Sequence, residues 1–164
     1  MNPTDRAEGP LLVCYDGSDD AKHAIESAAS LIGNRRALIA TVWQPFAGMD
    51  SLGWSGATAS GVNFVELDHA AAEGGARTAD DGVRIAREAG MDAEPVTEKA
   101  TGPVWRTILE LADRHDAAAI VMGCRGFTGI RSVLLGSTSS AVVHHADRPT
   151  LVVHRPNGHD GHKD

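Results

Sequence analysis

Aromatic side chains and cysteines are scarce in this sequence. Only 4% of its 164 residues are aromatic, and it has two cysteines, Cys14 and Cys124. Two cysteines are too few for a disulfide scaffold or an all-cysteine zinc site, so both of these classes of small domain are excluded. Few aromatics beside abundant alanine and glycine predict a core of small side chains, which lets helices approach a sheet closely.

Positive charge and long apolar runs are also lacking. The 15 lysines and arginines are outnumbered by 22 aspartates and glutamates, which gives a net charge of -7. Non-specific binding to nucleic acid or to an anionic membrane needs a cationic surface, so we expect neither partner. The longest apolar run, from Ala117 to Met122, is far shorter than the ~18 residues of a membrane span. The N-terminus lacks the basic-then-apolar pattern of a secretory signal, so the expected location is cytoplasmic.

The sequence contains enough apolar residues to bury one core. Apolar types make up 42% of the chain, and its 164 residues correspond to about one domain. We place the folded domain at residues 10–155. Residues 1–9 and 156–164 are expected to form a flexible N-terminus and a flexible C-terminal tail.

Strand-like and helix-like segments alternate along the chain. Short apolar runs predict strands, and apolar residues spaced three and four positions apart predict helices. The predicted strands cover residues 11–15, 37–43, 93–99, 117–122 and 149–154, and the predicted helices begin near residues 18, 63, 103 and 136. This alternation is typical of an α/β protein with a single open, parallel five-stranded sheet and helices on both faces.

Several residues mark the ends of these elements. Ser18 is expected to cap the first helix, which ends at Gly33. Pro95 restricts the third strand to an edge of the sheet, and Pro103 is expected at the first helical position of its helix. The segment Pro45–Val62 has no regular pattern, so it is interpreted as a lid, a binding loop or a mobile insertion.

A glycine-containing segment connects the fourth strand to the last helix. Gly123 and Gly126 permit positive φ and let backbone N–H groups approach an anion. Gly136, Ser137 and Thr138 stand at a helix start, where free N–H groups and hydroxyls favour phosphate. The segment therefore predicts an anion site, most simply for a polyphosphate. The alternative is a loop whose glycines serve only for turning.

The spacing of these residues resembles the ATP-binding signature of the universal stress protein family. Gly123, Gly126, Gly136 and Ser137 match Gly-x2-Gly-x9-Gly-Ser, and further similarity lies in the Asp-Gly-Ser turn that begins at Asp16. The resemblance covers about residues 10–155. It implies a sheet of order 3-2-1-4-5 in a Rossmann-like fold of the adenine nucleotide alpha hydrolase type, with ATP across the tips of strands 1, 2 and 4.

The same resemblance implies roles for residues near the base and sugar of the nucleotide. Asp16 is expected to contact the ribose or a phosphate-bound Mg²⁺. The backbone at Thr41 and Val42 is expected to meet the adenine. Met122 and Gly123 are expected to flank the nucleoside.

The phosphates are assigned to the glycine-containing segment. By resemblance, Gly126, Gly136, Ser137 and Thr138 cradle them, with Arg125 as a charge partner. Cys124 departs from the small hydroxyl residue common in the family, and Thr138 departs from the common Val. Backbone-mediated contacts are expected to survive these changes.

Other interpretations of the residues stay open. Asp16 can instead cap its own turn. The ring of Tyr15 would crowd the site if it pointed inward. Trp43 can border the adenine or pack in the core. Cys14 and Cys124 can form a redox pair, although reduced buried thiols are the expected state in a cytosolic protein.

The last strand is expected at an edge of the sheet, where an apolar strand without a partner invites aggregation. Pairing with the same strand of a second copy would cover this edge, and the resemblance also implies a homodimer. The alternative is a monomer whose edge is covered by the tail. The residues at this expected interface are Thr150, Leu151, Val152, Val153 and His154.

These features lead to three hypotheses about function. The first is an ATP-binding universal stress protein, a dimeric nucleotide-dependent regulator or sensor in the stress response, holding ATP, ADP or AMP with Mg²⁺. The second is a slow adenine-nucleotide hydrolase or adenylyl-transfer enzyme, which lacks a clear general base apart from Asp16. The third is a stress-related interaction protein that does not bind nucleotide. No catalytic residue is assigned.

Overall fold

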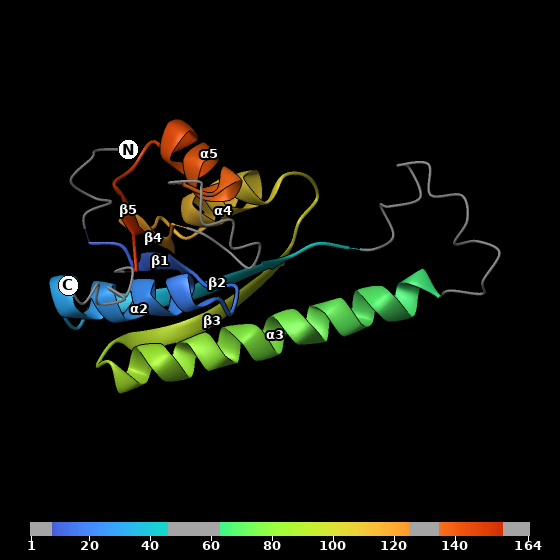
Figure 1. Cartoon of the computed structure of the whole chain (residues 1–164), viewed down its shortest axis with the longest axis horizontal. Coiled ribbons are helices and arrows are strands. Elements are labelled where there is room, and N and C mark those ends of the chain that lie inside the picture. Colours follow the sequence, from blue (N-terminus) through green and yellow to red (C-terminus); the bar gives the residue numbers. More distant parts are fainter. Residues whose placement is uncertain (1–7, 46–62, 125–134, 156–164) are drawn as a thin grey trace, which may run out of the picture.

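The computed structural model describes residues 8–45, 63–124 and 135–155. Five strands and four helices alternate along these residues, as the sequence predicts (Figure 1). The elements are β1 (Leu11–Cys14), α2 (Asp19–Ile32), β2 (Arg36–Trp43), α3 (Phe64–Glu88), β3 (Asp92–Lys99), α4 (Val104–Arg114), β4 (Ala119–Gly123), α5 (Ser137–His145) and β5 (Thr150–Val153). Most of Pro45–Val62 and of both termini lies outside the described residues, so the predictions for them stay predictions.

The strands form one parallel sheet of order β3-β2-β1-β4-β5, which confirms the predicted topology. The chain builds outward from β1 on one side and then crosses to β4 on the other, so β1 marks the topological switch point. Pro95 pairs with Ile39 in the edge strand β3, where its missing N–H faces no second neighbour in the described sheet.

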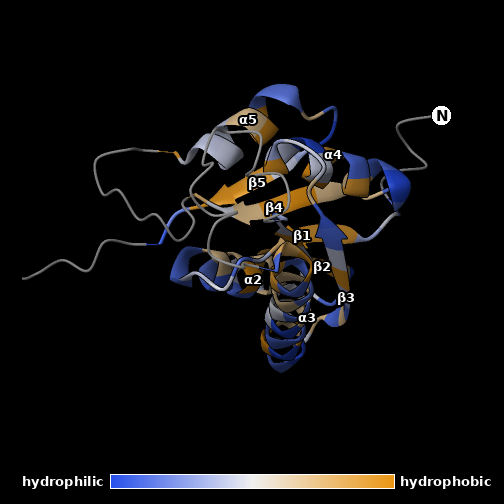
Figure 2. Cartoon of the chain, turned by 90° about the vertical axis from the view of Figure 1, so that its right-hand side faces the viewer, coloured by the Kyte–Doolittle hydropathy of each residue, from blue (hydrophilic) through white to orange (hydrophobic). Residues whose placement is uncertain are grey.

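The helices form two layers around the sheet. One layer contains α2 and α3, and the other contains α4 and α5 (Figure 1). Figure 2 shows apolar residues on the strands between the layers, except on the largely hydrophilic edge strand β3, and hydrophilic residues on the outer surfaces of the helices. The alanines Ala24 and Ala28 of α2 and Ala86 of α3 are fully buried, so this layer places small side chains against larger ones such as Ile39 of β2.

The helix ends follow the local signals with one exception. Ser18 caps α2 by accepting a hydrogen bond from the Ala21 N–H (3.3 Å), and Gly33 ends this helix with a φ of 78°. Pro103 was expected inside α4 but lies just before it as the N-cap, in an extended conformation with ψ at 134°. The reason is that its carbonyl faces the first turn, where it accepts from the Arg106 N–H (3.0 Å).

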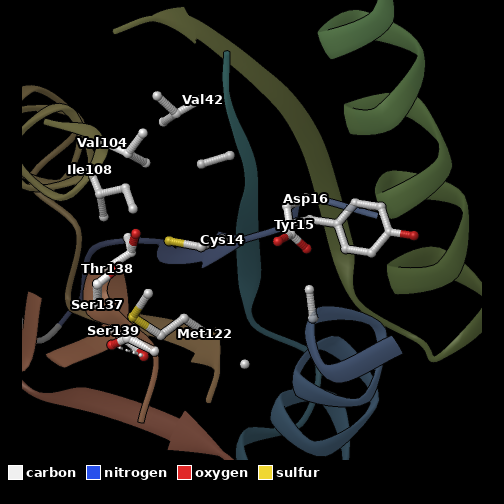
Figure 3. Close-up of a pocket in the computed structure, with 14 residues that line it drawn as sticks. Cys14, Tyr15, Asp16, Val42, Val104, Ile108, Met122, Ser137, Thr138 and Ser139 are labelled. Atoms are coloured by element: carbon white, nitrogen blue, oxygen red, sulfur yellow. Dashed lines mark hydrogen bonds between the residues drawn. The ribbon is translucent and has the colours of Figure 1, made fainter. Parts of the chain in front are cut away.

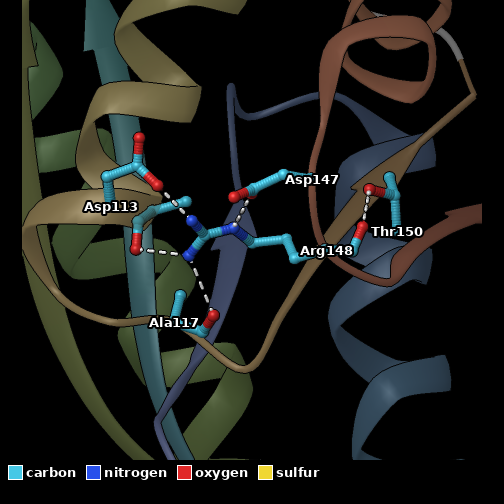
Figure 4. Close-up of polar contacts among 6 residues, drawn as sticks. Asp113, Ala117, Asp147, Arg148 and Thr150 are labelled. Atoms are coloured by element: carbon cyan, nitrogen blue, oxygen red, sulfur yellow. Dashed lines mark hydrogen bonds and ion pairs between the residues drawn. The ribbon is translucent and has the colours of Figure 1, made fainter. Parts of the chain in front are cut away.

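A buried arginine, Arg148, connects the C-terminal end of α4 with the turn that precedes β5. The side chain of Arg148, in the turn before β5, is 2% exposed. One of its terminal nitrogens donates to the carbonyls of Ala112 (2.7 Å) and Ala117 (3.0 Å). The rest of the guanidinium contacts the exposed carboxylates of Asp113 and Asp147 (Figure 4). Arg148 thus ties the C-terminal end of α4 to the start of β5.

None of the described helices, including the 25 residues of α3, combines the length and the apolar content that a transmembrane helix needs.

Candidate functional site

A cavity of about 180 Å³ opens at the carboxyl ends of the central strands (Figure 3). In open α/β sheets, ligands bind at this edge beside the topological switch point. Strands β1, β2 and β4 and helices α2, α4 and α5 contribute to the wall. The lining residues are Cys14, Tyr15, Asp16, Ala21, Ala40, Val42, Val104, Ile108, Met122, Gly123, Gly136, Ser137, Thr138 and Ser139.

The cavity has an apolar part and a polar part. Val42 from β2 and Val104 and Ile108 from α4 lie together on one side (Figure 3). The hydroxyl residues Ser137 and Thr138 line another part at the start of α5. An apolar wall beside a few fixed polar groups is the usual composition of a site for a small organic ligand.

The N-terminus of α5 is held against the end of β4. Gly136 is the N-cap in an extended conformation, and its N–H donates to the Cys124 carbonyl (2.7 Å). The Ser139 hydroxyl donates to the same carbonyl (3.0 Å). Because the first N–H groups of a helix have no intrahelical acceptor, Ser137 and Thr138 offer backbone donors as well as hydroxyls beside the cavity.

Gly123 is required for a different reason from the one that the sequence suggested. Its φ is not positive; in the described residues only Gly17, Gly33 and Gly90 are glycines with positive φ. A Cβ at Gly123 would lie 2.7 Å from the Asp20 carbonyl carbon and 2.8 Å from the Ala21 nitrogen. The glycine therefore lets β4 approach the backbone of α2 closely.

Asp16 caps its own turn and also lies in the cavity wall. One of its carboxylate oxygens accepts a hydrogen bond from the Ser18 N–H (2.9 Å), which closes the turn between β1 and α2. The residue is exposed and lines the cavity. A single carboxylate of this kind suits Mg²⁺ that is already bound to substrate phosphates, because Mg²⁺ is often held by one or two carboxylates plus phosphates and waters. The described residues contain no cluster of three or more His, Cys, Asp or Glu that would hold a metal by themselves.

The two predicted adenine contacts, Thr41 and Val42, face opposite ways. Thr41 does not line the cavity; its hydroxyl is buried and donates to the Tyr15 carbonyl (2.8 Å). Alternate residues of a strand point their peptide groups to the same neighbour, and Ala40 bonds β1 through its carbonyl. The N–H and C=O of Val42 therefore point towards the β1 side. The last paired residues of β1 and β2 are Cys14 and Ala40, so Val42 lies beyond the paired part of these strands.

The aromatic residues near the cavity do not fill it. The ring of Tyr15 points towards α3 (Figure 3), and its hydroxyl donates to an Asp81 carboxylate oxygen (2.9 Å). Trp43 is absent from the cavity wall and lies against Gly75 of α3, with the Lys99 ammonium 5.4 Å from its ring centre. The packing interpretation therefore holds for Trp43, and Tyr15 does not crowd the site.

Most of the predicted site residues share this cavity, and two cannot be placed. Asp16, Val42, Met122, Gly123, Gly136, Ser137 and Thr138 all line it. Arg125 and Gly126 lie outside the described residues, so their phosphate roles stay predictions. Sequence reasoning missed Cys14, Val104 and Ile108 as lining residues. The spacing of Val104 and Ile108 indicates an apolar helix face. The spacing alone does not show that this face also reaches the cavity at the ends of the strands.

The described residues include both cysteines, and no disulfide joins them. The Cys124 thiol is buried and donates to an Asp20 carboxylate oxygen (3.1 Å). Burial in the cavity wall, with a smaller contribution from the charge of Asp16, raises the pKa of Cys14 from 9.0 to about 12. A pKa this high indicates a thiol that stays protonated and unreactive at neutral pH.

The raised pKa of Cys14 predicts a loss of stability in alkaline solution. Between pH 9 and about pH 12 the unfolded chain loses this proton while the folded chain keeps it. The free energy of unfolding should therefore fall by up to ~1.4 kcal/mol per pH unit from this group alone. Urea unfolding of the wild type and of Cys14→Ala at pH ~8 and ~10 measures the difference. Equal losses in the two proteins would contradict the assignment to Cys14.

Comparison with known proteins agrees with this geometry. The model of the universal stress protein family matches residues 9–154. Universal stress protein MJ0531 of Methanocaldococcus jannaschii is 30% identical over 150 residues, which cover 89% of this chain and 82% of the relative.

Solved structures show the same fold. Hypothetical protein MJ0577 aligns with a TM-score of 0.72 and 20% identity, covering 92% of this chain and 99% of the other. The universal stress protein of Archaeoglobus fulgidus in complex with dAMP aligns with a TM-score of 0.60 and 23% identity, covering 88% and 97%. With the family model spanning nearly the whole described fold and the cavity at its switch point, the chain belongs to the universal stress protein family.

Proposed function

We propose that this protein binds an adenine nucleotide in the cavity, ATP with Mg²⁺ in particular, and acts as a nucleotide-dependent regulator or sensor in the stress response. The observation that carries the proposal is the meeting of two complementary features in one cavity. The Val42 peptide edge suits a base, and the N-terminus of α5 suits an anion.

The Val42 peptide group offers a donor and an acceptor side by side. Adenine presents an acceptor at N1 and a donor at its N6 amine, so both can be satisfied by one residue. Guanine presents a donor at N1 and an acceptor at O6, which would leave both polar groups mismatched. The apolar side chains of Val42, Val104 and Ile108 would cover the faces of the base.

The polar part of the cavity would hold the sugar and phosphates. The N–H groups and hydroxyls of Ser137 and Thr138, with Gly136 before them, would bind phosphate at the start of α5. Gly126 and Arg125 belong to the same proposal. Asp16 would contact the ribose or Mg²⁺; when bound, that ion offsets part of the phosphate charge.

Relatives with bound nucleotides support the adenine assignment. One fold neighbour, from Archaeoglobus fulgidus, is in complex with dAMP. Another universal stress protein is in complex with cAMP, and a family member from Arabidopsis thaliana has AMP bound. All three ligands share the adenine base, which is the part that we assign to Val42.

Binding rather than turnover fits the lining residues. Among the described residues of the wall, Asp16 is the only carboxylate, and the proposal assigns it to the ribose or Mg²⁺. A general base for hydrolysis would need a free acceptor at the reacting water. We therefore propose a regulator over the hydrolase alternative.

The same proposal includes a cytoplasmic homodimer. Strand β5 pairs only with β4 in the described sheet, which leaves its other edge for a second copy. Residues 150–154 would form the contact between the two copies. The sedimentation mass of the purified chain measures its oligomeric state.

Isothermal titration calorimetry tests the nucleotide site directly. ATP should bind, and GTP should bind ~10- to 100-fold more weakly because its base mismatches the Val42 peptide. The double substitution Ser137→Ala/Thr138→Val should weaken ATP about tenfold and AMP less, since AMP carries one phosphate. Ser140→Ala on the exposed side of the same helix is the matched control and should bind like the wild type. An absence of binding at millimolar ATP would refute the proposal.

A further inference from the structure

Tyr15 stands between the proposed nucleotide site and helix α3, and three hydrogen bonds to β2 and α3 hold it. Its N–H donates to the Ala40 carbonyl (2.9 Å), and its own carbonyl accepts from the Thr41 hydroxyl (2.8 Å). Its phenol hydroxyl donates to Asp81 of α3 (2.9 Å). Both backbone polar groups and the side-chain tip of this one residue are therefore fixed.

The packing of α3 on Tyr15 is equally constrained. A Cβ at Gly82 would lie 2.6 Å from a ring carbon of Tyr15 and 2.7 Å from a methyl carbon of Ile39. Gly82 therefore lets α3 pack directly against the ring of Tyr15, a residue that is 5% exposed. The Asp81 carboxylate is aimed by a second contact, since its other oxygen accepts from Arg84 (2.6 Å). The position of α3 and the position of Tyr15 cannot change independently.

Tyr15 directly precedes Asp16, whose carboxylate lines the cavity. Their side chains point in different directions, with the Tyr15 ring towards α3 and Asp16 at the cavity edge (Figure 3). One peptide bond joins the two residues, and the next turn contains Gly17 at a φ of 87°. A shift of the Tyr15 backbone would therefore be transmitted to the Asp16 carboxylate.

We propose that Tyr15 is a positioning residue, which couples the nucleotide site to α3 through its hydrogen bonds to Asp81 and Thr41. The inference rests on the proposed function for its ligand, an adenine nucleotide. It gives Thr41 a role distinct from base contact: the hydroxyl holds the Tyr15 carbonyl from the β2 side. Nucleotide bound at Asp16 would then stiffen the contact between β1 and α3.

Hydrogen exchange tests the positioning without any nucleotide. Tyr15→Phe removes only the phenol hydroxyl, and we expect the Ser18 amide, which bonds to Asp16, to exchange about three- to tenfold faster. Thr78→Val is the matched control, because the Thr78 hydroxyl donates to the Gly74 carbonyl within α3. Unchanged exchange at Ser18, or an equal change in the control, would overturn the inference.

A double-mutant cycle tests the coupling to the ligand. Tyr15→Phe and Asp16→Asn should each weaken ATP binding, Tyr15→Phe by about three- to tenfold. The loss of affinity in the double variant should be smaller than the product of the two single losses. Thr41→Val should weaken binding in the same direction as Tyr15→Phe. Additive effects, or full affinity in Tyr15→Phe, would overturn the coupling. If the wild type bound no nucleotide, the proposed function would fail, while the exchange experiment would still decide the positioning.

Discussion

Gly123→Ala is expected to lower the free energy of unfolding by about 3 kcal/mol, because the new Cβ overlaps the backbone of a helix. The atoms in its way are the carbonyl carbon and oxygen of Asp20 and the nitrogen of Ala21, all within 2.8 Å. Backbone atoms cannot rotate aside as a flexible side chain does, so α2 would have to move away from β4. Urea unfolding followed by circular dichroism measures the loss.

Gly102→Ala is the matched control for this substitution. Nothing lies within 4 Å of a Cβ at Gly102, and its φ is not positive. This variant should stay within about 0.5 kcal/mol of the wild type. If Gly123→Ala were equally mild, the close approach of β4 and α2 would be wrong.

Arg148→Ala is expected to cost about 3 kcal/mol as well, for an electrostatic reason. The substitution removes the side-chain donor from the Ala117 carbonyl and from the Ala112 carbonyl, which keeps the Ala117 N–H (2.9 Å). It also breaks the contacts with Asp113 and Asp147. An acceptor that loses its partner inside a fold costs about 1–3 kcal/mol. Thermal and urea unfolding should both show the loss.

Two further variants separate the geometry of Arg148 from its charge. Arg148→Lys keeps the positive charge but not the planar fork that reaches two carbonyls and two carboxylates, so an intermediate loss is expected. Arg36→Ala removes an exposed pair with Glu94 (3.0 Å) and should cost at most about 1 kcal/mol. If Arg148→Ala lowered the free energy of unfolding no more than Arg36→Ala does, the stabilising role of the buried Arg148 contacts would be wrong.

Local sequence signals predicted the order of the elements and several of their ends. Ser18 and Gly33 act at the ends of α2 through contacts within a few residues. The alternation of strand-like and helix-like runs is also visible in the sequence without knowledge of which elements pack together. Pro95 indicated an edge strand because a missing N–H has the same consequence in any sheet. The spacing from Gly123 to Ser137 supported the family resemblance, from which the site followed at the strand tips.

Tertiary structure decided how those residues are used. Register alone makes Val42, and not Thr41, face the cavity, because the β1–β2 pairing ends at Cys14 and Ala40. The direction of the Tyr15 ring, the reason for glycine at 123 and the burial of Arg148 each depend on an element distant in the chain. Local propensity carries no information about such partners, since the contacts arise only after the layers have packed. Local patterns along the chain specify which helices and strands form, whereas the packing of the layers specifies which side of each element lines the cavity.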